Sequence, residues 1–451
     1  MRFVVLAVIL VSLPAFMSML RSHPHKRGLA FTAIGLMLFL GDTLRIDGAI
    51  IAWPLWTGTV RGMEISPIDS LSLALILTRP RLPGRVPLWG VIAFYGAAVT
   101  MSLVPASVPM ATFFVCWQFA RMTLLFAALA SEIHRDDLRG GLLTGLSLGL
   151  MLQASYVIQQ KAHGMVQATG TMFHQNSLGM MTELALLPLL AALLAGDRRK
   201  LIVAGIGAGL IVIAGGGSRG AMAISGGGVV VLMLLSLIRG YTPVKGKVVG
   251  LGMLALAIAA PLAALTLKDR FGSNSITAQD DQRPAFERAA TAMASDHPFG
   301  VGANLYVPTA NTKGYADRAG VAWNFANRSA PVHNAYLLTR AETGWLGELA
   351  LILMLVVPLL AGLRLAFSRR QGFAGEMALG SAVAMGVNIV HNNFEFAVVT
   401  YNVLAMVFLN LAIIASQIRG ERYRKNARPA PQRAPAPRLT PGLAVAGRRA
   451  R

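Results

Sequence analysis

The sequence predicts an all-α polytopic membrane protein with about 12 transmembrane helices and a large, partly helical periplasmic loop. Of its 451 residues, 55% are hydrophobic and only 14% are charged, and the mean hydropathy is +0.57. A soluble domain of this length needs far more charge to cover its surface. Apolar runs recur along most of the chain, and many approach the roughly 20 residues that a helix needs to cross a bilayer.

The first apolar run, Phe3–Leu20, follows a single basic residue and is not followed by a clean small-residue cleavage site. We therefore interpret it as a retained helix and not as a signal peptide. The sequence does not decide whether one more helix lies near the N-terminus, and therefore does not decide on which side of the membrane Met1 lies. The later runs are Val91–Val104, Ala111–Ala130, Leu138–Ile158, Leu201–Ala214, Val229–Ile238, Val248–Leu267, Leu346–Leu363 and Val398–Ile418.

The net charge of +21 comes from 41 Lys and Arg against 20 Asp and Glu. In a soluble protein this excess would suggest nucleic acid. Here the basic residues gather in short loops that alternate with loops lacking them, as the positive-inside rule expects, so no nucleic-acid partner is predicted. We place the basic loops in the cytoplasm and the others in the periplasm, as expected of a multi-pass protein of the bacterial inner membrane. The basic segments are Arg21–Arg27, Arg79–Arg85, His134–Arg139, Asp197–Lys200, Arg239–Lys247, Arg364–Arg370 and the tail from Arg419.

Two long polar segments divide the chain into four parts. Residues 1–267 and 334–418 form the two parts of the transmembrane bundle. Residues 268–333 form the large periplasmic loop, whose helix-compatible stretch and many aromatic residues favour a folded cap. Residues 419–451, rich in Arg, Pro and Ala, predict a disordered basic cytoplasmic tail that contacts anionic lipid.

Motifs for several chemistries are missing from the sequence. The one cysteine, Cys116, lies in an apolar run and allows neither an intrachain disulfide nor a cysteine metal cluster. There is no Walker A motif, no HExxH on a helix, and no carboxylate pair or Asp-rich loop with the spacing of a divalent-metal site near a membrane face. We therefore expect no cofactor and no metal.

The first polar cluster at a predicted periplasmic helix end is Gly170–Ser177. Asn176 or Ser177 would cap the helix that starts there, which is also the simplest explanation of the motif. Glu183, two turns further on, would be costly if it faced lipid.

The second cluster is Gly215–Ala221, which contains Ser218 and Arg219. An arginine that reaches the lipid interface is the simpler interpretation. A glycine-rich approach on the non-cytoplasmic side favours a functional one, because glycine permits close backbone approach and the guanidinium fork matches phosphate.

The third cluster begins with Pro331, His333 and Asn334 and continues to Glu342 and Gly347. It predicts a helix start with His333 at the N-terminus, where the helix dipole favours the neutral imidazole that a general base requires. The simpler alternatives are a cap for His333 and a structural partner of a buried arginine for Glu342. A further group, from Asn388 to Glu395, predicts polar packing between helices and no direct chemical role.

These clusters, in this order, resemble the O-antigen ligase and O-antigen polymerase superfamily over about residues 170–395. The resemblance rests on four elements: Thr171–Asn176, Ser218–Ala221, Arg283 with His297–Gly302, and His333–Gly347. Family members often carry a tryptophan four residues after the arginine of the large loop, which here is Arg283. Glu287 stands at that position in this chain, which leaves Arg288 as a second candidate beside Arg283.

The resemblance implies transfer of a glycan from an undecaprenyl-pyrophosphate carrier to an acceptor hydroxyl at the periplasmic face. Arg219 and Arg283 (or Arg288) would bind the pyrophosphate, and His333 would be the base. The supporting residues would be Asn176, Ser218, Asn334 and Glu342. The acceptor would be lipid A core, a glycan or a protein, with polysaccharide-assembly proteins as further partners. The alternatives are a transporter or flippase of lipid-linked glycans and a non-catalytic scaffold.

Overall fold

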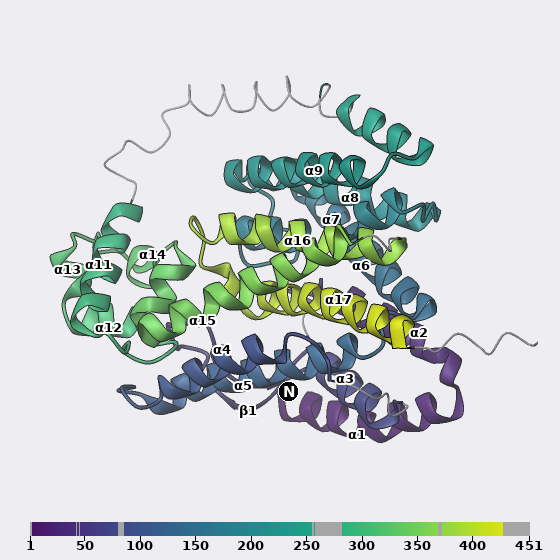
Figure 1. The fold of residues 1–451 in the computed structure, drawn as a ribbon. Helices are drawn as coiled ribbons and strands as arrows, with labels where there is room; N and C mark the ends of the chain where they lie inside the picture. The colour runs from purple at the N-terminus through teal and green to yellow at the C-terminus, as the bar shows by residue number, and fades with distance from the viewer. Residues whose placement is uncertain are drawn as a thin grey trace, which may run out of the picture.

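The computed structural model describes residues 2–41, 43–44, 46–79, 85–254, 257, 282–368 and 372–426. Within these residues the chain is mostly helical, and its long helices lie side by side in one bundle (Figure 1). The first half contains α1 (Arg2–Ser22), η1 (Pro24–Lys26), α2 (Arg27–Met37), β1 (Gly48–Ala52), β2 (Gly62–Ile65), α3 (Pro67–Thr78), α4 (Trp89–Met101), α5 (Pro109–Ala130), α6 (Asp136–Ala162), α7 (Gln175–Leu194), α8 (Lys200–Gly216) and α9 (Arg219–Arg239). The second half contains α11 (Arg283–Asp296), α12 (Tyr306–Thr312), α13 (Tyr315–Arg318), α14 (Phe325–Arg328), α15 (Ala335–Ala366), α16 (Phe373–His391), η2 (Ala397–Val399) and α17 (Tyr401–Asn426).

Eight helices in the described residues are long and apolar enough to cross a membrane: α1, α5, α6, α7, α9, α15, α16 and α17. Three shorter apolar helices, α3, α4 and α8, accompany them. The predicted class of a helical, polytopic membrane protein is thereby confirmed. Helix α17 continues to Asn426, past the predicted end at residue 418. The rest of the predicted tail, residues 268–281 of the predicted loop and most of the run Val248–Leu267 lie outside the described residues.

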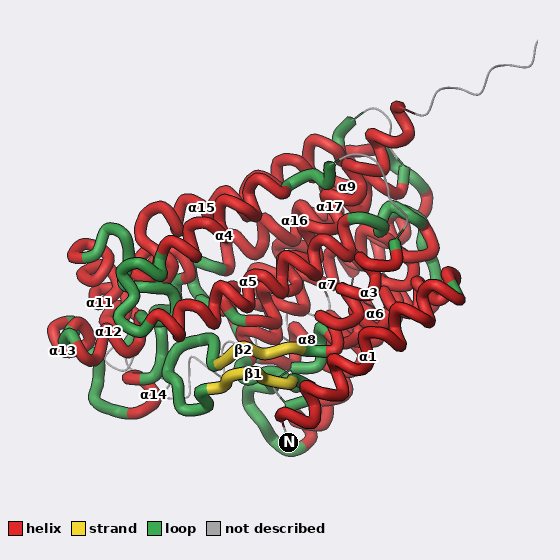
Figure 2. The backbone as a smooth tube through the Cα atoms, turned by 90° about the horizontal axis from the view of Figure 1, so that it is seen from below, coloured by secondary structure: helices red, strands yellow, loops and turns green. Residues whose placement is uncertain are grey.

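A short antiparallel hairpin departs from the all-helical prediction. Strands β1 and β2 pair Gly48 with Ile65 and Ala49 with Glu64, and the hairpin lies beside α1 (Figure 2). Trp117 of α5 donates from Nε1 to the backbone oxygen of Glu64 at 2.7 Å. The hairpin takes the place of part of a predicted loop. The sequence did not predict it, because β1 is short and lacks the alternation of polar and apolar residues that marks a half-buried strand.

The centre of the bundle is formed by α7 and α17, whose apolar windows are 89% and 94% buried. Elsewhere, close packing depends on glycine. A Cβ on Gly35 of α2 would lie 2.8 Å from the backbone oxygen of Leu142 in α6, and one on Gly145 would lie 2.2 Å from that of Thr32. Small residues allow membrane helices to approach this closely.

Helices α11–α14 cover one end of the bundle, which we call the loop end (Figure 1). The turn 297–302 docks there on a break in α15 at Gly344, where φ is 71°. The backbone N–H of Val301 donates to the oxygen of Ala341 at 3.0 Å, and that of Gly302 donates to the oxygen of Glu342 at 2.8 Å. The backbone N–H groups of the turn therefore bond to carbonyl oxygens of α15 that lose their partners within the helix at the break. The described part of the predicted loop is thus folded.

The opposite end of the bundle carries buried ion pairs. Arg27 pairs with Glu132. Glu376 pairs with both Arg239 and Lys245. Charged side chains among apolar helices are costly unless they are paired. These contacts connect helix ends that the sequence predicts to be cytoplasmic.

We expect Glu376→Ala to lower the free energy of unfolding by about 3–5 kcal/mol, because it leaves two buried cations without a counter-charge. Denaturant unfolding of the detergent-solubilised protein measures this change. Asp136→Ala is the control, since that carboxylate pairs with Arg139 at the surface with its side chain 89% exposed, and it should unfold close to wild type. Equal effects of the two substitutions would contradict a stabilising role for the Glu376 contacts.

Candidate functional site

Glu395, in the turn that follows α16, is the meeting point of three predicted site residues. Its side chain is only 4% exposed. Oε1 accepts from Nη2 of Arg283 at 3.4 Å and from the side-chain amide of Asn176. Oε2 lies 3.2 Å from Nδ1 of His333. We call these four residues the Glu395 cluster. Segments that are far apart in sequence therefore converge on one buried carboxylate at the loop end.

The His333 ring lies between two aromatic rings, with centroid distances of 6.0 Å to Phe286 and 5.5 Å to Phe396. Its side chain is 23% exposed, so it remains accessible. A neutral ring that donates from Nδ1 to Glu395 presents a lone pair on Nε2. This pairing of an imidazole with an orienting carboxylate is the arrangement that a general base needs.

Asn334 confirms the predicted start of α15. Its Oδ1 accepts from the backbone N–H groups of Tyr336 at 3.0 Å and Leu337 at 3.1 Å. The backbone N–H of Ala335 donates to the oxygen of Asn392 at 2.9 Å. The end of α16 therefore fixes the position of the α15 start, and with it the distance between His333 and Glu395.

The start of α7 corrects one prediction. Asn176 or Ser177 was expected to cap this helix, but the cap is His174, whose Nδ1 accepts from the backbone N–H of Asn176 at 3.2 Å. The Asn176 side chain is thereby available to Glu395. Burial lowers the pKa of His174, the negative charge of Glu395 opposes this, and the positive charge of Arg283 lowers the pKa further. His174 was missed because histidine is not among the preferred capping residues.

Ser218 caps α9, because its Oγ accepts from the backbone N–H of Ala221 at 3.3 Å. Arg219 is the first residue of α9 and is exposed. Helix α9 starts against α7, since a Cβ on Gly179 would lie 2.5 Å from the Cβ of Ala221. Arg219 therefore stands at the same end of the bundle as the Glu395 cluster, on a neighbouring helix.

The structure distinguishes the two loop arginines. Arg283 reaches Glu395 with its side chain 48% exposed. Arg288 points elsewhere on α11, where its Nη2 donates to the backbone oxygen of Ala319 at 2.8 Å. Residues five apart on a helix lie on different faces. Arg288 thus stabilises the loop through its bond to the Ala319 backbone, and of the two arginines Arg283 is the one that belongs to the Glu395 cluster.

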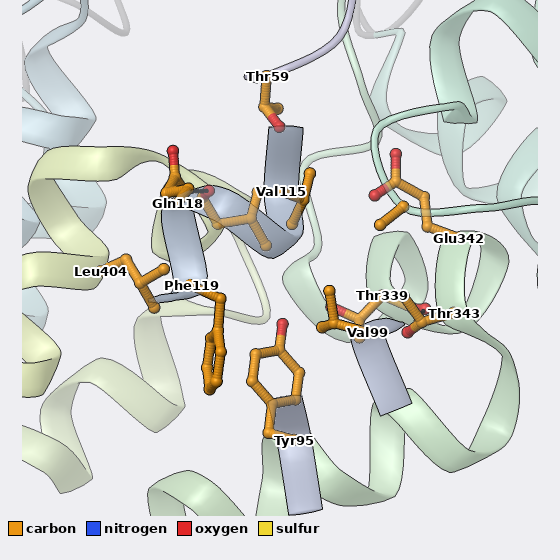
Figure 3. A pocket seen from close by; sticks show the side chains of 12 residues that line it. Thr59, Tyr95, Val99, Val115, Gln118, Phe119, Thr339, Glu342, Thr343 and Leu404 are labelled. Atoms are coloured by element: carbon orange, nitrogen blue, oxygen red, sulfur yellow. Dashed lines mark hydrogen bonds between the residues drawn. The ribbon is translucent and has the colours of Figure 1, made fainter. Parts of the chain in front are cut away.

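Glu342 lies further along α15 and has a different environment. Its Oε1 accepts from the backbone N–H of Tyr306 at 3.1 Å, so its observed partner is the loop backbone and not a buried arginine, which was the simpler alternative. It borders a cavity of about 30 Å³ together with Tyr95 and Thr339 (Figure 3). This volume suits one or two water molecules and is too small for a sugar ring. Glu342 therefore supports the loop and does not line a substrate cavity here.

A second acid–histidine pair lies between α7, α9 and α16. His391 Nδ1 is 3.1 Å from Oε1 of Glu183, and Ser225 Oγ donates to Oε2 of Glu183 at 3.1 Å. Glu183 is fully buried within the protein, which avoids the cost of a carboxylate facing lipid. Polar packing was expected for the whole segment 388–395. His391 and Glu395 both make such contacts between segments, and the partners of Glu395 include the candidate site residues His333 and Arg283.

Neither a scan of protein-family models nor a search of curated proteins finds a match to this chain. The Glu395 cluster combines a histidine, a carboxylate that contacts it and an arginine with an accessible side chain. Among the described residues, no group of three or more His, Cys, Asp or Glu side chains is placed to hold a metal ion.

We expect the thermal stability of the wild type to fall more steeply between about pH 7.5 and pH 5.5 than that of His174→Asn. The pKa of folded His174 is below its ordinary value of 6.5, so the unfolded chain takes up the proton first and stability is lost as pH falls through that value. Asparagine caps the helix without titrating. Parallel pH profiles of the melting temperature would contradict this assignment.

Proposed function

We propose that the protein is a metal-independent glycosyltransferase that moves a glycan from an undecaprenyl-pyrophosphate carrier to an acceptor hydroxyl. The observation that best supports this function is the Glu395 cluster, in which a candidate base and a candidate phosphate-binding arginine share one carboxylate. The order of motifs that resembles the O-antigen ligase and polymerase superfamily supports it independently of this geometry.

In the proposed reaction, Nε2 of His333 takes the proton of the acceptor hydroxyl as its oxygen attacks the anomeric carbon. The bond from that carbon to the pyrophosphate oxygen breaks, and attack opposite the leaving group inverts the anomeric carbon. Glu395 holds the imidazole in orientation and stabilises the imidazolium that forms. Arg283 and Arg219 bind the pyrophosphate, since guanidinium groups match its oxygens and its charge.

The proposed orientation puts the loop end in the periplasm and the basic helix ends in the cytoplasm, with about twelve membrane passes. A lipid carrier in the inner membrane would then present its pyrophosphate at the level of the Glu395 cluster. Ligases and polymerases share this chemistry and differ in the acceptor, which is lipid A core, a growing glycan or a protein side chain.

A transporter or flippase of lipid-linked glycans is the second candidate, and the break in α15 at Gly344 is the observation in its favour. Broken helices form the substrate sites of many transporters. Here, however, the turn 297–302 fills the break and uses its backbone groups. The exposed arginines and His333 also gather at one end of the bundle. The enzyme is therefore the better-supported proposal.

We expect His333→Ala to lower glycan transfer by about 10²–10⁴-fold, the range that a general base contributes. The assay uses purified protein, lipid-linked glycan and acceptor, at matched protein abundance. His163→Ala is the control, because His163 is exposed at the end of α6 and bonds its own helix at Gln159. Undiminished transfer by His333→Ala would rule out the role of base.

Arg283→Gln and Arg288→Gln form a matched pair on α11. We expect Arg283→Gln to weaken transfer at least about tenfold, because charge-assisted hydrogen bonds to pyrophosphate are lost. Arg288→Gln should lower thermal stability through loss of the contact with Ala319 and leave transfer per folded protein nearly unchanged. The reverse pattern would assign the pyrophosphate to Arg288.

A further inference from the structure

The ring of His174 is held in one tautomer by the start of α7. The backbone N–H of Asn176 donates to its Nδ1 at 3.2 Å. A ring nitrogen that accepts a hydrogen bond carries no proton, so the hydrogen of the neutral ring is on Nε2. Burial lowers the pKa of this ring below its ordinary value, which keeps it neutral near pH 7. His174 therefore offers a fixed N–H donor at Nε2.

This donor lies in the same turn as a residue of the Glu395 cluster, because His174 caps the helix through the backbone N–H of Asn176. Asn176, two residues later in the same turn, is bonded to Glu395. The ring is partly exposed, as are the side chains of His333 and Arg283. All three side chains are therefore partly accessible at the loop end of the bundle.

Capping alone does not account for a histidine at this position. Asn, Asp, Ser and Thr are the residues that cap helices best, and each would accept from the same backbone N–H. Compared with these residues, histidine adds an imidazole ring whose second nitrogen can donate a hydrogen bond. Two other helices that start at this end follow the general preference, with Ser218 capping α9 and Asn334 capping α15, whereas α11 has no side-chain cap.

We propose that His174 is a second catalytic imidazole, whose Nε2–H donates a hydrogen bond to the departing pyrophosphate. This inference rests on the proposed function and adds a residue to it. As the acceptor oxygen bonds to the anomeric carbon, the carbon–oxygen bond to pyrophosphate breaks and its electron pair stays on the pyrophosphate. The proton of the acceptor goes to His333. His174 keeps its own proton and stabilises the negative charge that develops, as neutral imidazoles do in other enzymes.

Two substitutions separate the cap from the donor. In His174→Asn the amide oxygen replaces Nδ1 as the cap, but nothing replaces the Nε2 donor. In His174→Gln the longer side chain returns an N–H donor near the position of Nε2, while the cap is weakened. Both are compared with the wild type and with His163→Asn, in melting temperature and in transfer per folded protein from undecaprenyl-pyrophosphate-linked glycan.

We expect His174→Asn to melt close to wild type and to lose about 10–10²-fold in kcat, with the KM for the acceptor little changed. Inhibition by undecaprenyl pyrophosphate should weaken in the same variant. His174→Gln should melt lower and keep most of its activity per folded protein. These readouts would not follow from a purely structural role.

Full activity of His174→Asn, with activity lost in His174→Gln in proportion to stability, would overturn the inference and leave His174 as a cap. In that case the wild type and His163→Asn still transfer glycan, so the proposed function stands. A wild-type protein that transfers no glycan would overturn the proposed function itself and this inference with it.

Discussion

An ionised carboxylate that is almost closed off from solvent needs opposite charge and hydrogen bonds within a few ångström, because its desolvation costs several kcal/mol. Glu395 is a carboxylate with a side chain only 4% exposed, and its partners come from three other segments of the chain. Arg283 comes from the first turn of α11, Asn176 from the first turn of α7, and His333 from the residue before the α15 cap. The arrangement of the loop end depends on satisfying this one side chain.

Neighbouring contacts keep these partners in place. The backbone hydrogen bond from Ala335 to Asn392 connects the start of α15 with the end of α16. The buried Glu183–His391 pair connects α7 with α16 below the cluster. The turn 297–302 is attached to the break at Gly344, so the loop that carries Arg283 is anchored to the helix that follows His333. A site held from several rigid elements loses little geometry to thermal motion.

Much of this arrangement could be predicted from local patterns. Apolar runs and basic loops indicated the membrane class, and Pro331 and Asn334 indicated the start of α15. The role of Glu395 could not, because its contact with His333 spans 62 positions and depends on how α16 packs. The choice between Arg283 and Arg288 likewise could not be made from the sequence, because it depends on which face of α11 packs against the rest of the protein. The β1–β2 hairpin was missed because its strands are short and lack a clear alternation.

The central claim is that Glu395 acts on the reaction through His333, and a double-mutant cycle tests it most directly. Glycan transfer is measured for Glu395→Gln, His333→Gln and the double variant at matched abundance of folded protein. The account predicts a loss of at least about tenfold for Glu395→Gln in the wild-type background and little further loss once His333 is replaced. An equal loss from Glu395→Gln in both backgrounds would contradict it.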